Sequence, residues 1–258
     1  MRVEEVLRDR RAQGRGSLIG YFPAGYPTVD DSVAALVAMA QEGCDILEVG
    51  VPYSDPVMDG EVIQRATEKA LASGFRLSNL FEVIQRVRQQ TEVPILVMSY
   101  WNPVIRFGLE SFAKQLSESG AQGMITPDLI PDEAASWLDV SDQVGLERVF
   151  LVAPSSSPAR TKQNAEASRG FVYAVSTMGI TGERAELDRL ARSVTEGIRD
   201  VSDIPVCVGV GVSNGQQVAE VNSYADGAIV GTAIIRAYEE GGLEALRAKV
   251  RELASGLG

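Results

Sequence analysis

Short apolar runs alternate with longer stretches of helical period along the whole sequence, and this alternation restricts the fold more than any other feature. Near-continuous apolar strands separated by helices indicate a parallel sheet covered by helices on its outer face. The helical stretches include residues 30–43, 109–120 and 157–167, most with Gly near their ends. Eight runs read as strands: residues 17–22, 45–49, 94–100, 123–126, 148–153, 170–175, 204–210 and 226–231.

Eight strand and helix units in 258 residues predict an α/β fold, the closed (β/α)₈ TIM barrel, as a single domain over residues 1–258. An open doubly wound sheet is the alternative, but the segment YFPAGYP after the first strand lacks the glycine-rich dinucleotide turn of that fold. Residues 1–17 alternate charged and apolar positions, which predicts an extra N-terminal helix. They lack the continuous apolar core of a signal peptide, so we expect a cytoplasmic protein.

Charge and residue content exclude several classes of function. Asp and Glu outnumber Lys and Arg by 35 to 24, and the net charge of −11 argues against nucleic acid or an anionic membrane as a partner. The sequence contains no histidine, which excludes Ser-His-Asp and Cys-His catalysis and histidine metal sites. Cys44 and Cys207 are isolated, so we expect buried thiols rather than a disulfide or a metal site. Proton transfer therefore falls to carboxylate, Tyr, Lys or Cys.

Two carboxylates stand where the mouth of such a barrel is expected. In the segment DILEVG, strand alternation places Ile46, Glu48 and Gly50 on one face, and an inward face would bring Glu48 near the active-site end. Burial would raise its pKa toward neutrality and make it a workable acid and base. The alternative is a structural carboxylate satisfied by Arg or by backbone donors. Asp59 belongs to an Asp-Gly turn dipeptide, yet at the same mouth it would complete an acid and base pair.

Glycine-rich loops follow the last three strands. They read STMGITGER at residues 176–184, GVGVSNG at residues 209–215 and GAIVGTA at residues 227–233. Backbone N–H groups at a helix N-terminus bind an anion without Lys or Arg, and barrels of this kind often hold a phosphate near the last two strands. The loops therefore predict a phosphate site, although glycines also occur at strand ends as simple turn formers.

Six motifs along nearly the whole chain occupy residues 48–60, 100–108, 126–133, 151–160, 176–184 and 209–218. Together and in this order they resemble the α-subunit family of tryptophan synthase. The resemblance implies a (β/α)₈ lyase of tryptophan biosynthesis that cleaves indole-3-glycerol phosphate to indole and glyceraldehyde 3-phosphate, with no metal or organic cofactor in this subunit. Indole would pass to a β subunit that uses pyridoxal phosphate, in an α₂β₂ heterotetramer.

The resemblance also implies roles for individual residues. Glu48 matches the acid and base that protonates the indole ring carbon, and Asp59 matches the carboxylate that faces the indole N–H. The matching phosphate ligands are Gly182, Gly211, Gly231 and Thr232, the last in place of the more usual serine. The matching substrate contacts are Tyr21, Met98, Ile125, Tyr173, Thr181 and Ile229. For Tyr21, Met98, Ile125 and Ile229, ordinary barrel core is the alternative.

Contacts with the β subunit are implied in the loops around Pro52, Asp55, Asn102 and Pro131. From the sequence alone, Asn102 and the proline after it read as a simple turn. Glu61, where the family usually has proline, and the pair at residues 177–178 depart from the family pattern, which leaves the strength of coupling to a β subunit open. Two other functions remain as alternatives: a self-sufficient lyase that releases free indole, and a non-catalytic phosphate-binding barrel that acts as a partner.

Overall fold

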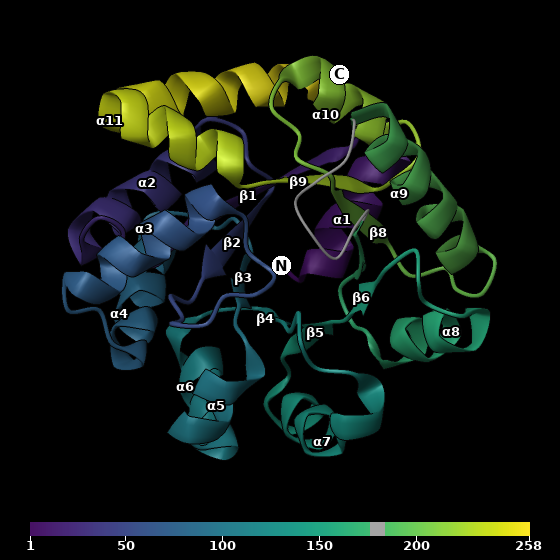
Figure 1. Cartoon of the computed structure of the whole chain (residues 1–258), viewed down its shortest axis with the longest axis horizontal. Coiled ribbons are helices and arrows are strands. Elements are labelled where there is room, and N and C mark those ends of the chain that lie inside the picture. Colours follow the sequence, from purple (N-terminus) through teal and green to yellow (C-terminus); the bar gives the residue numbers. More distant parts are fainter. Residues whose placement is uncertain (176–183) are drawn as a thin grey trace.

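The computed structural model describes residues 1–175 and 184–258 and contains one parallel sheet surrounded by helices (Figure 1). The sheet order in the described residues is β5-β4-β3-β2-β1-β9-β8-β7-β6. The strands are β1 Ser17–Pro23, β2 Ile46–Gly50, β3 Ile95–Met98, β4 Gly123–Ile125, β5 Glu147–Val149, β6 Leu151–Val152, β7 Val172–Val175, β8 Val206–Gly209 and β9 Gly227–Val230.

The sheet closes on itself through the chain. Its two end strands, β5 and β6, are consecutive and are separated by Phe150 alone. They are the two halves of the predicted run 148–153, which is interrupted because the Phe150 amide donates to the Ser168 hydroxyl at 3.2 Å. The predicted (β/α)₈ barrel is therefore confirmed, with one of its eight strands divided in two.

Helices form the outer ring in Figure 1, and most follow a strand directly. Two connections carry a pair of helices, one between β2 and β3 and one between β3 and β4. The helices of the described residues are α1 Val3–Ala12, α2 Val29–Gln41, α3 Glu61–Ala72, α4 Leu77–Arg88, α5 Trp101–Phe107, α6 Leu109–Ser119, α7 Ala135–Val144, α8 Pro158–Ala167, α9 Arg184–Arg199, α10 Gly215–Asn222 and α11 Thr232–Ala254, with short 3₁₀ turns η1 Pro131–Glu133 and η2 Ser255–Leu257.

Local signals explain where several helices begin and bend. The Thr28 hydroxyl accepts from the Asp31 amide at the start of α2, and Ser157 caps α8 ahead of a proline in the first turn. Near its middle α11 is kinked at Gly241 and Gly242, whose backbone angles leave the helical region. No helix among residues 1–175 and 184–258 is long and apolar enough to cross a membrane.

The predicted N-terminal helix is confirmed as α1, and it closes the amino end of the barrel. Val3, Val6 and Leu7 pack into the barrel interior as part of a buried apolar cluster. Cys44 and Cys207 are buried free thiols, as expected. The strand side chains in the cluster are Ile19, Ile46, Leu96, Ile125, Val149, Phe171, Cys207 and Ile229.

Three buried carboxylates at this amino end hold α1 in place. Glu147 accepts from the Val3 amide at 2.9 Å, where the helix N-terminus favours a negative charge. Asp226 accepts from Arg11 at 3.1 Å. Asp45 accepts from Arg10 at 2.9 Å and from Arg15 at 2.8 Å. With its amino end filled by α1, the barrel is left with its carboxyl end as the place for a binding site.

Candidate active site

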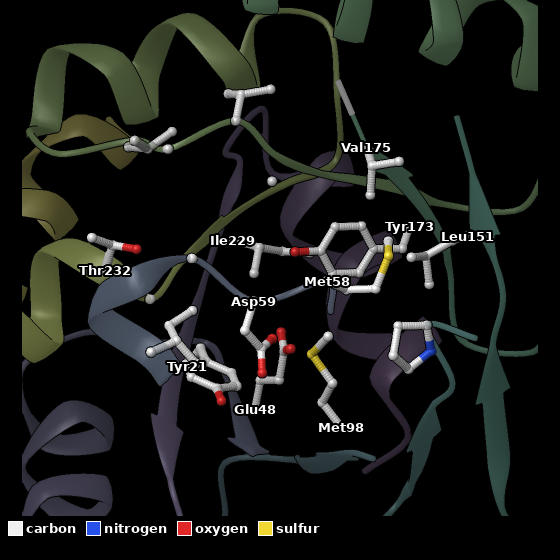
Figure 2. Close-up of a pocket in the computed structure, with 18 of the residues that line it drawn as sticks. Tyr21, Glu48, Met58, Asp59, Met98, Leu151, Tyr173, Val175, Ile229 and Thr232 are labelled. Atoms are coloured by element: carbon white, nitrogen blue, oxygen red, sulfur yellow. The ribbon is translucent and has the colours of Figure 1, made fainter. Parts of the chain in front are cut away.

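A cavity of about 350 Å³ opens at the carboxyl ends of the strands (Figure 2). Its volume is in the range typical of small-molecule sites. Glu48 and Asp59 lie together near its centre, and apolar side chains surround them. The other residues in its wall that the sequence predicts as site residues are Tyr21, Met98, Tyr173, Gly211, Ile229, Gly231 and Thr232.

Glu48 lies on β2, and its side chain is almost fully enclosed, with 1 % of the residue exposed. Its neighbour in the β1 register is Tyr21. Glu48 Oε2 is buried and accepts no hydrogen bond from any described residue. Burial, and secondly the charge of Asp59, raise the pKa of Glu48 to about 8. Glu48 is therefore a carboxylic acid that can hold its proton at neutral pH.

Asp59 reaches the same cavity from the loop between β2 and α3. The loop is held from behind, because Gln64 Nε2 on α3 donates to the Asp59 carbonyl at 2.8 Å. The Asp59 amide donates to the Pro56 carbonyl at 3.0 Å, which closes a turn. Burial raises the pKa of Asp59 to about 7.

The two carboxylates form a pair that shares protons near neutral pH. Figure 2 shows their oxygen atoms beside each other, and in an apolar cavity two adjacent negative charges are costly. Glu48 is the more deeply buried of the two, with 1 % of the residue exposed, so the remaining proton is better retained on Glu48 when the pair holds one negative charge. The pair therefore offers one proton donor and one proton acceptor within one cavity.

Glycines at two strand ends make room for tyrosines beside this pair. A Cβ at Gly50 would lie 2.1 Å from the Tyr21 hydroxyl, and a Cβ at Gly209 would lie 2.4 Å from the Tyr173 hydroxyl. Burial and the nearby carboxylates raise the pKa of both tyrosines well above the usual range, so both remain neutral. Their hydroxyls are thus available as hydrogen-bond donors at the cavity wall.

A third part of the cavity wall is made of backbone at the N-terminus of α11 and in the loop between β8 and α10. Gly231 and Thr232 begin α11, and Gly211 lies in that loop, four residues ahead of α10, with a φ of 67°, a left-handed conformation that favours glycine. All three line the cavity, so one helix N-terminus, that of α11, stands at the cavity as a place that favours an anion. Two further candidates, Thr181 and Gly182, lie outside the described residues.

One predicted contact, Ile125, is not among the residues that line the cavity. It ends β4 with no exposed surface and packs in the apolar cluster of the barrel interior, together with residues of α1. The structure therefore places Ile125 with the barrel core, whereas Met98 beside it in the sheet register does reach the cavity.

Comparison with known proteins agrees with this arrangement over the whole chain. A sequence model of the family described as tryptophan synthase alpha chain matches residues 7–256. The chain belongs to the tryptophan synthase alpha chain family. It is 52% identical over 255 residues to the tryptophan synthase alpha chain of Leifsonia xyli subsp. xyli, covering 99% of this chain and 98% of the relative. Members of this family are lyases of tryptophan biosynthesis.

Solved structures of tryptophan synthase share the fold as well. The Mycobacterium tuberculosis enzyme in space group F222 superimposes with a TM-score of 0.94 and 50% identity, covering 99% of this chain and 98% of the other. The tryptophan synthase complex of Pyrococcus furiosus gives a TM-score of 0.84 at 32% identity, covering 93% of this chain and 98% of the other. The alpha chain fold is thus retained at much lower identity.

The residues expected to meet a tryptophan synthase β subunit divide into two groups. Asp55 and Asn102 are exposed, whereas Pro52 and Pro131 are buried and offer little surface to a partner. Three large apolar side chains in the same segments are exposed instead: Val57 at 79%, Ile105 on α5 at 52% and Ile130 at 42%. Exposed apolar side chains near one another can mark a protein-binding surface.

Several residues that line the cavity were not predicted from the sequence. Met58 and Gln64 flank the predicted Asp59, and Leu151 belongs to a predicted strand, so neighbourhood and strand alternation were available signals. Val212 lies beside the predicted Gly211. Among the described residues, no cluster of three or more Cys, Asp or Glu side chains could hold a metal ion.

The raised pKa of Glu48 predicts a pH-dependent cost to stability. Unfolded Glu ionises near 4.5 and folded Glu48 near 8, so between these values the folded state binds more protons and the free energy of unfolding falls as pH rises. Glu48→Gln removes this fall. We expect the variant to gain on the order of 3–6 kcal/mol over the parent between pH 4.5 and pH 8.5, since a shift of about 3.5 pKa units corresponds to roughly 5 kcal/mol.

Urea unfolding of parent and variant at several pH values measures this difference. The exposed residue Glu110 gives a matched control, because Glu110→Gln makes the same chemical change outside the cavity. A Glu48→Gln curve that stays parallel to the parent across this pH range would show that Glu48 ionises as freely as an exposed carboxyl group.

Proposed function

We propose that this chain cleaves indole-3-glycerol phosphate to indole and glyceraldehyde 3-phosphate, as a carbon–carbon lyase of tryptophan biosynthesis within a single domain over residues 1–258. The observation that carries the proposal is the pair Glu48 and Asp59, enclosed in one cavity with pKa values raised to about 8 and about 7. Family membership supports the same reaction.

The cleavage is a retro-aldol reaction in which the ring must first accept a proton. Glu48 donates its proton to the ring carbon that bears the glyceryl side chain, while Asp59 takes the proton of the indole N–H. The resulting indolenine accepts electrons, so the bond to the side chain breaks when ionised Glu48 removes the proton of the adjacent hydroxyl. Asp59 then returns its proton to the ring nitrogen, and both carboxyl groups regain their starting states.

The rest of the cavity suits the two ends of this substrate. The apolar side chains of Met98 and Ile229, with Tyr21 and Tyr173, would contact the indole ring, and the buried Ile125 would support them from the barrel interior. The phosphate would bind at the backbone N–H groups of Gly231 and Thr232 at the start of α11 and of Gly211 in the loop ahead of α10, which requires no cationic side chain. Thr181 and Gly182 are proposed to complete the substrate and phosphate contacts.

A β subunit is the proposed partner, in an α₂β₂ heterotetramer in the cytoplasm. The exposed Asp55 and Asn102, together with exposed Val57 and Ile130, support a partner-binding surface at the barrel mouth. Pro52 and Pro131 would shape the loops rather than make the contact. In this proposal the chain needs no cofactor of its own, and pyridoxal phosphate belongs to the β subunit.

The reaction is tested by following indole after the chain is mixed with indole-3-glycerol phosphate, with and without a cognate β subunit. We expect slow release of indole by the chain alone and faster cleavage with the β subunit. Rapid turnover that the β subunit does not change would favour a self-sufficient lyase. No cleavage under either condition would leave only the non-catalytic partner.

The phosphate site gives a second prediction. Gly211→Val should weaken affinity for glyceraldehyde 3-phosphate by about tenfold or more, because a side chain there would block close approach of the anion to backbone N–H groups. Gly74→Val is the matched control, since Gly74 also has a positive φ, 92°, and open space around it, but lies at the end of α3 away from the cavity.

Calorimetric titration of both variants with glyceraldehyde 3-phosphate separates local strain from loss of the site. If both lose affinity equally, strain explains the loss. If Gly211→Val binds as tightly as the parent, the phosphate does not lie at this loop.

A further inference from the structure

Tyr100 lies directly beyond the carboxyl end of β3 and is buried, but it does not line the cavity. Its hydroxyl oxygen accepts a hydrogen bond from the backbone amide of Met58 at 2.8 Å. Met58 immediately precedes Asp59, so Tyr100 binds the peptide chain one residue from the carboxylate that faces Glu48. The hydrogen bond joins the loop after β2 to the end of the neighbouring strand.

The loop that carries Asp59 has fixed contacts on two sides. Gln64 holds the Asp59 carbonyl from α3 at 2.8 Å, and Tyr100 holds the Met58 amide from the β3 side. Val57, which precedes Met58 in the loop, is 79% exposed, so it contributes little apolar packing to the loop. Polar contacts of this kind therefore set where the Asp59 side chain points.

Tyr100 is itself held by two further residues. Its ring packs against Tyr53 with centroids 5.2 Å apart, and the Tyr53 hydroxyl accepts from Asn102 Nδ2 at 3.0 Å. Burial, and then the charge of Asp59, raise the pKa of Tyr100 above its usual range. The hydroxyl therefore stays neutral at working pH and does not take part in the titration of the carboxylate pair.

We infer that Tyr100 is a positioning residue for the cleavage reaction, acting through Asp59: its hydroxyl fixes the peptide between Met58 and Asp59 so that the Asp59 carboxylate stays directed at the indole nitrogen. The inference rests on the proposed function. Without the hydroxyl, the Met58 amide loses its acceptor and the loop gains freedom on that side. A misplacement of about 1 Å remote from the reacting atoms can cost on the order of 10²-fold in rate.

The test is the effect of Tyr100→Phe on kcat in two backgrounds. In the parent, kcat should fall by about 10- to 100-fold with little change in KM, because the ring and the cavity are retained. In an Asp59→Asn background, the same substitution should change kcat by less than about twofold, because the group that it positions is already inactive. Tyr26→Phe is the control: it removes a tyrosine hydroxyl that contacts Glu239 and does not line the cavity, and kcat should stay near the parent value.

Each outcome decides the matter. An unchanged kcat in Tyr100→Phe overturns the inference, and so does an equal loss in both backgrounds, which would make Tyr100 independent of Asp59. A loss of affinity for glyceraldehyde 3-phosphate in parallel with kcat would indicate general disorder of the site instead. If the parent chain itself fails to cleave the substrate with a β subunit present, the proposed function fails, and that result is separate from any effect of Tyr100.

Discussion

Replacement of Glu48 by Gln is expected to lower kcat for cleavage of indole-3-glycerol phosphate by about 10²–10⁴-fold. Glutamine keeps the shape of the side chain in a position where 1 % of the residue is exposed, but it has no proton to donate to the ring carbon. Affinity for glyceraldehyde 3-phosphate should persist, since the loop at Gly211 and the start of α11 at Thr232 are unchanged. Single-turnover release of indole measures the chemical step directly.

Glu61 provides the matched control for this substitution. It is an exposed carboxylate at the start of α3, near the mouth but outside the cavity wall, so Glu61→Gln should leave kcat within about twofold of the parent. A folded Glu48→Gln variant with close to parental kcat would remove Glu48 from the mechanism.

Asp59→Asn is expected to lower kcat by about 10²-fold or more, because an amide cannot take the proton of the indole N–H. The two variants should differ in their pH profiles. The parent needs Asp59 ionised and Glu48 protonated, so its kcat/KM, which reports the free enzyme, should pass through a maximum near neutral pH. Asp59→Asn should lose the rising limb, and Glu48→Gln should lose the falling limb.

The residual activity of each variant must be measured from about pH 5.5 to about pH 9.5. When two coupled groups have close pKa values, the bell-shaped pH profile of the parent reports the pair rather than either residue, so the variants are needed to assign the limbs. If both variants kept the full bell at reduced height, other groups would control the protonation of the site. An Asp59→Asn variant that retained parental kcat would assign Asp59 to the turn at residues 59–60 alone.

Strand and helix alternation predicted the barrel because each strand is buried on both faces and therefore apolar throughout. Glu48 was predictable for the same reason: a charge in such a run stands out. The division of the run at residues 148–153 was not, because it depends on the hydroxyl of Ser168, which follows α8 and meets Phe150 only in the folded chain. Local periodicity carries no information about such a contact.

Site residues that depend on loop geometry were the harder part. Pro52 and Pro131 are loop positions where sequence does not show which side faces solvent, and both are buried. Ile125 and Met98 are paired in the sheet, yet only Met98 lines the cavity. The alternation of side chains along a strand predicts which face a residue occupies, but not whether its side chain reaches the cavity. The role of Glu147 was also hidden, since its partner amides lie 143 and 144 residues away in α1.

The docking of α1 has a consequence for synthesis of the chain. Arg11 and its partner Asp226 are 215 residues apart, so α1 binds a carboxylate that is made long after the helix. At about 5–20 residues per second, α1 waits roughly 10–40 s for this partner on the ribosome. Throughout that interval its apolar face, Val3, Val6 and Leu7, has no completed barrel to enter. Although α1 is made well before Asp226, it is thus among the last elements to be fixed in place.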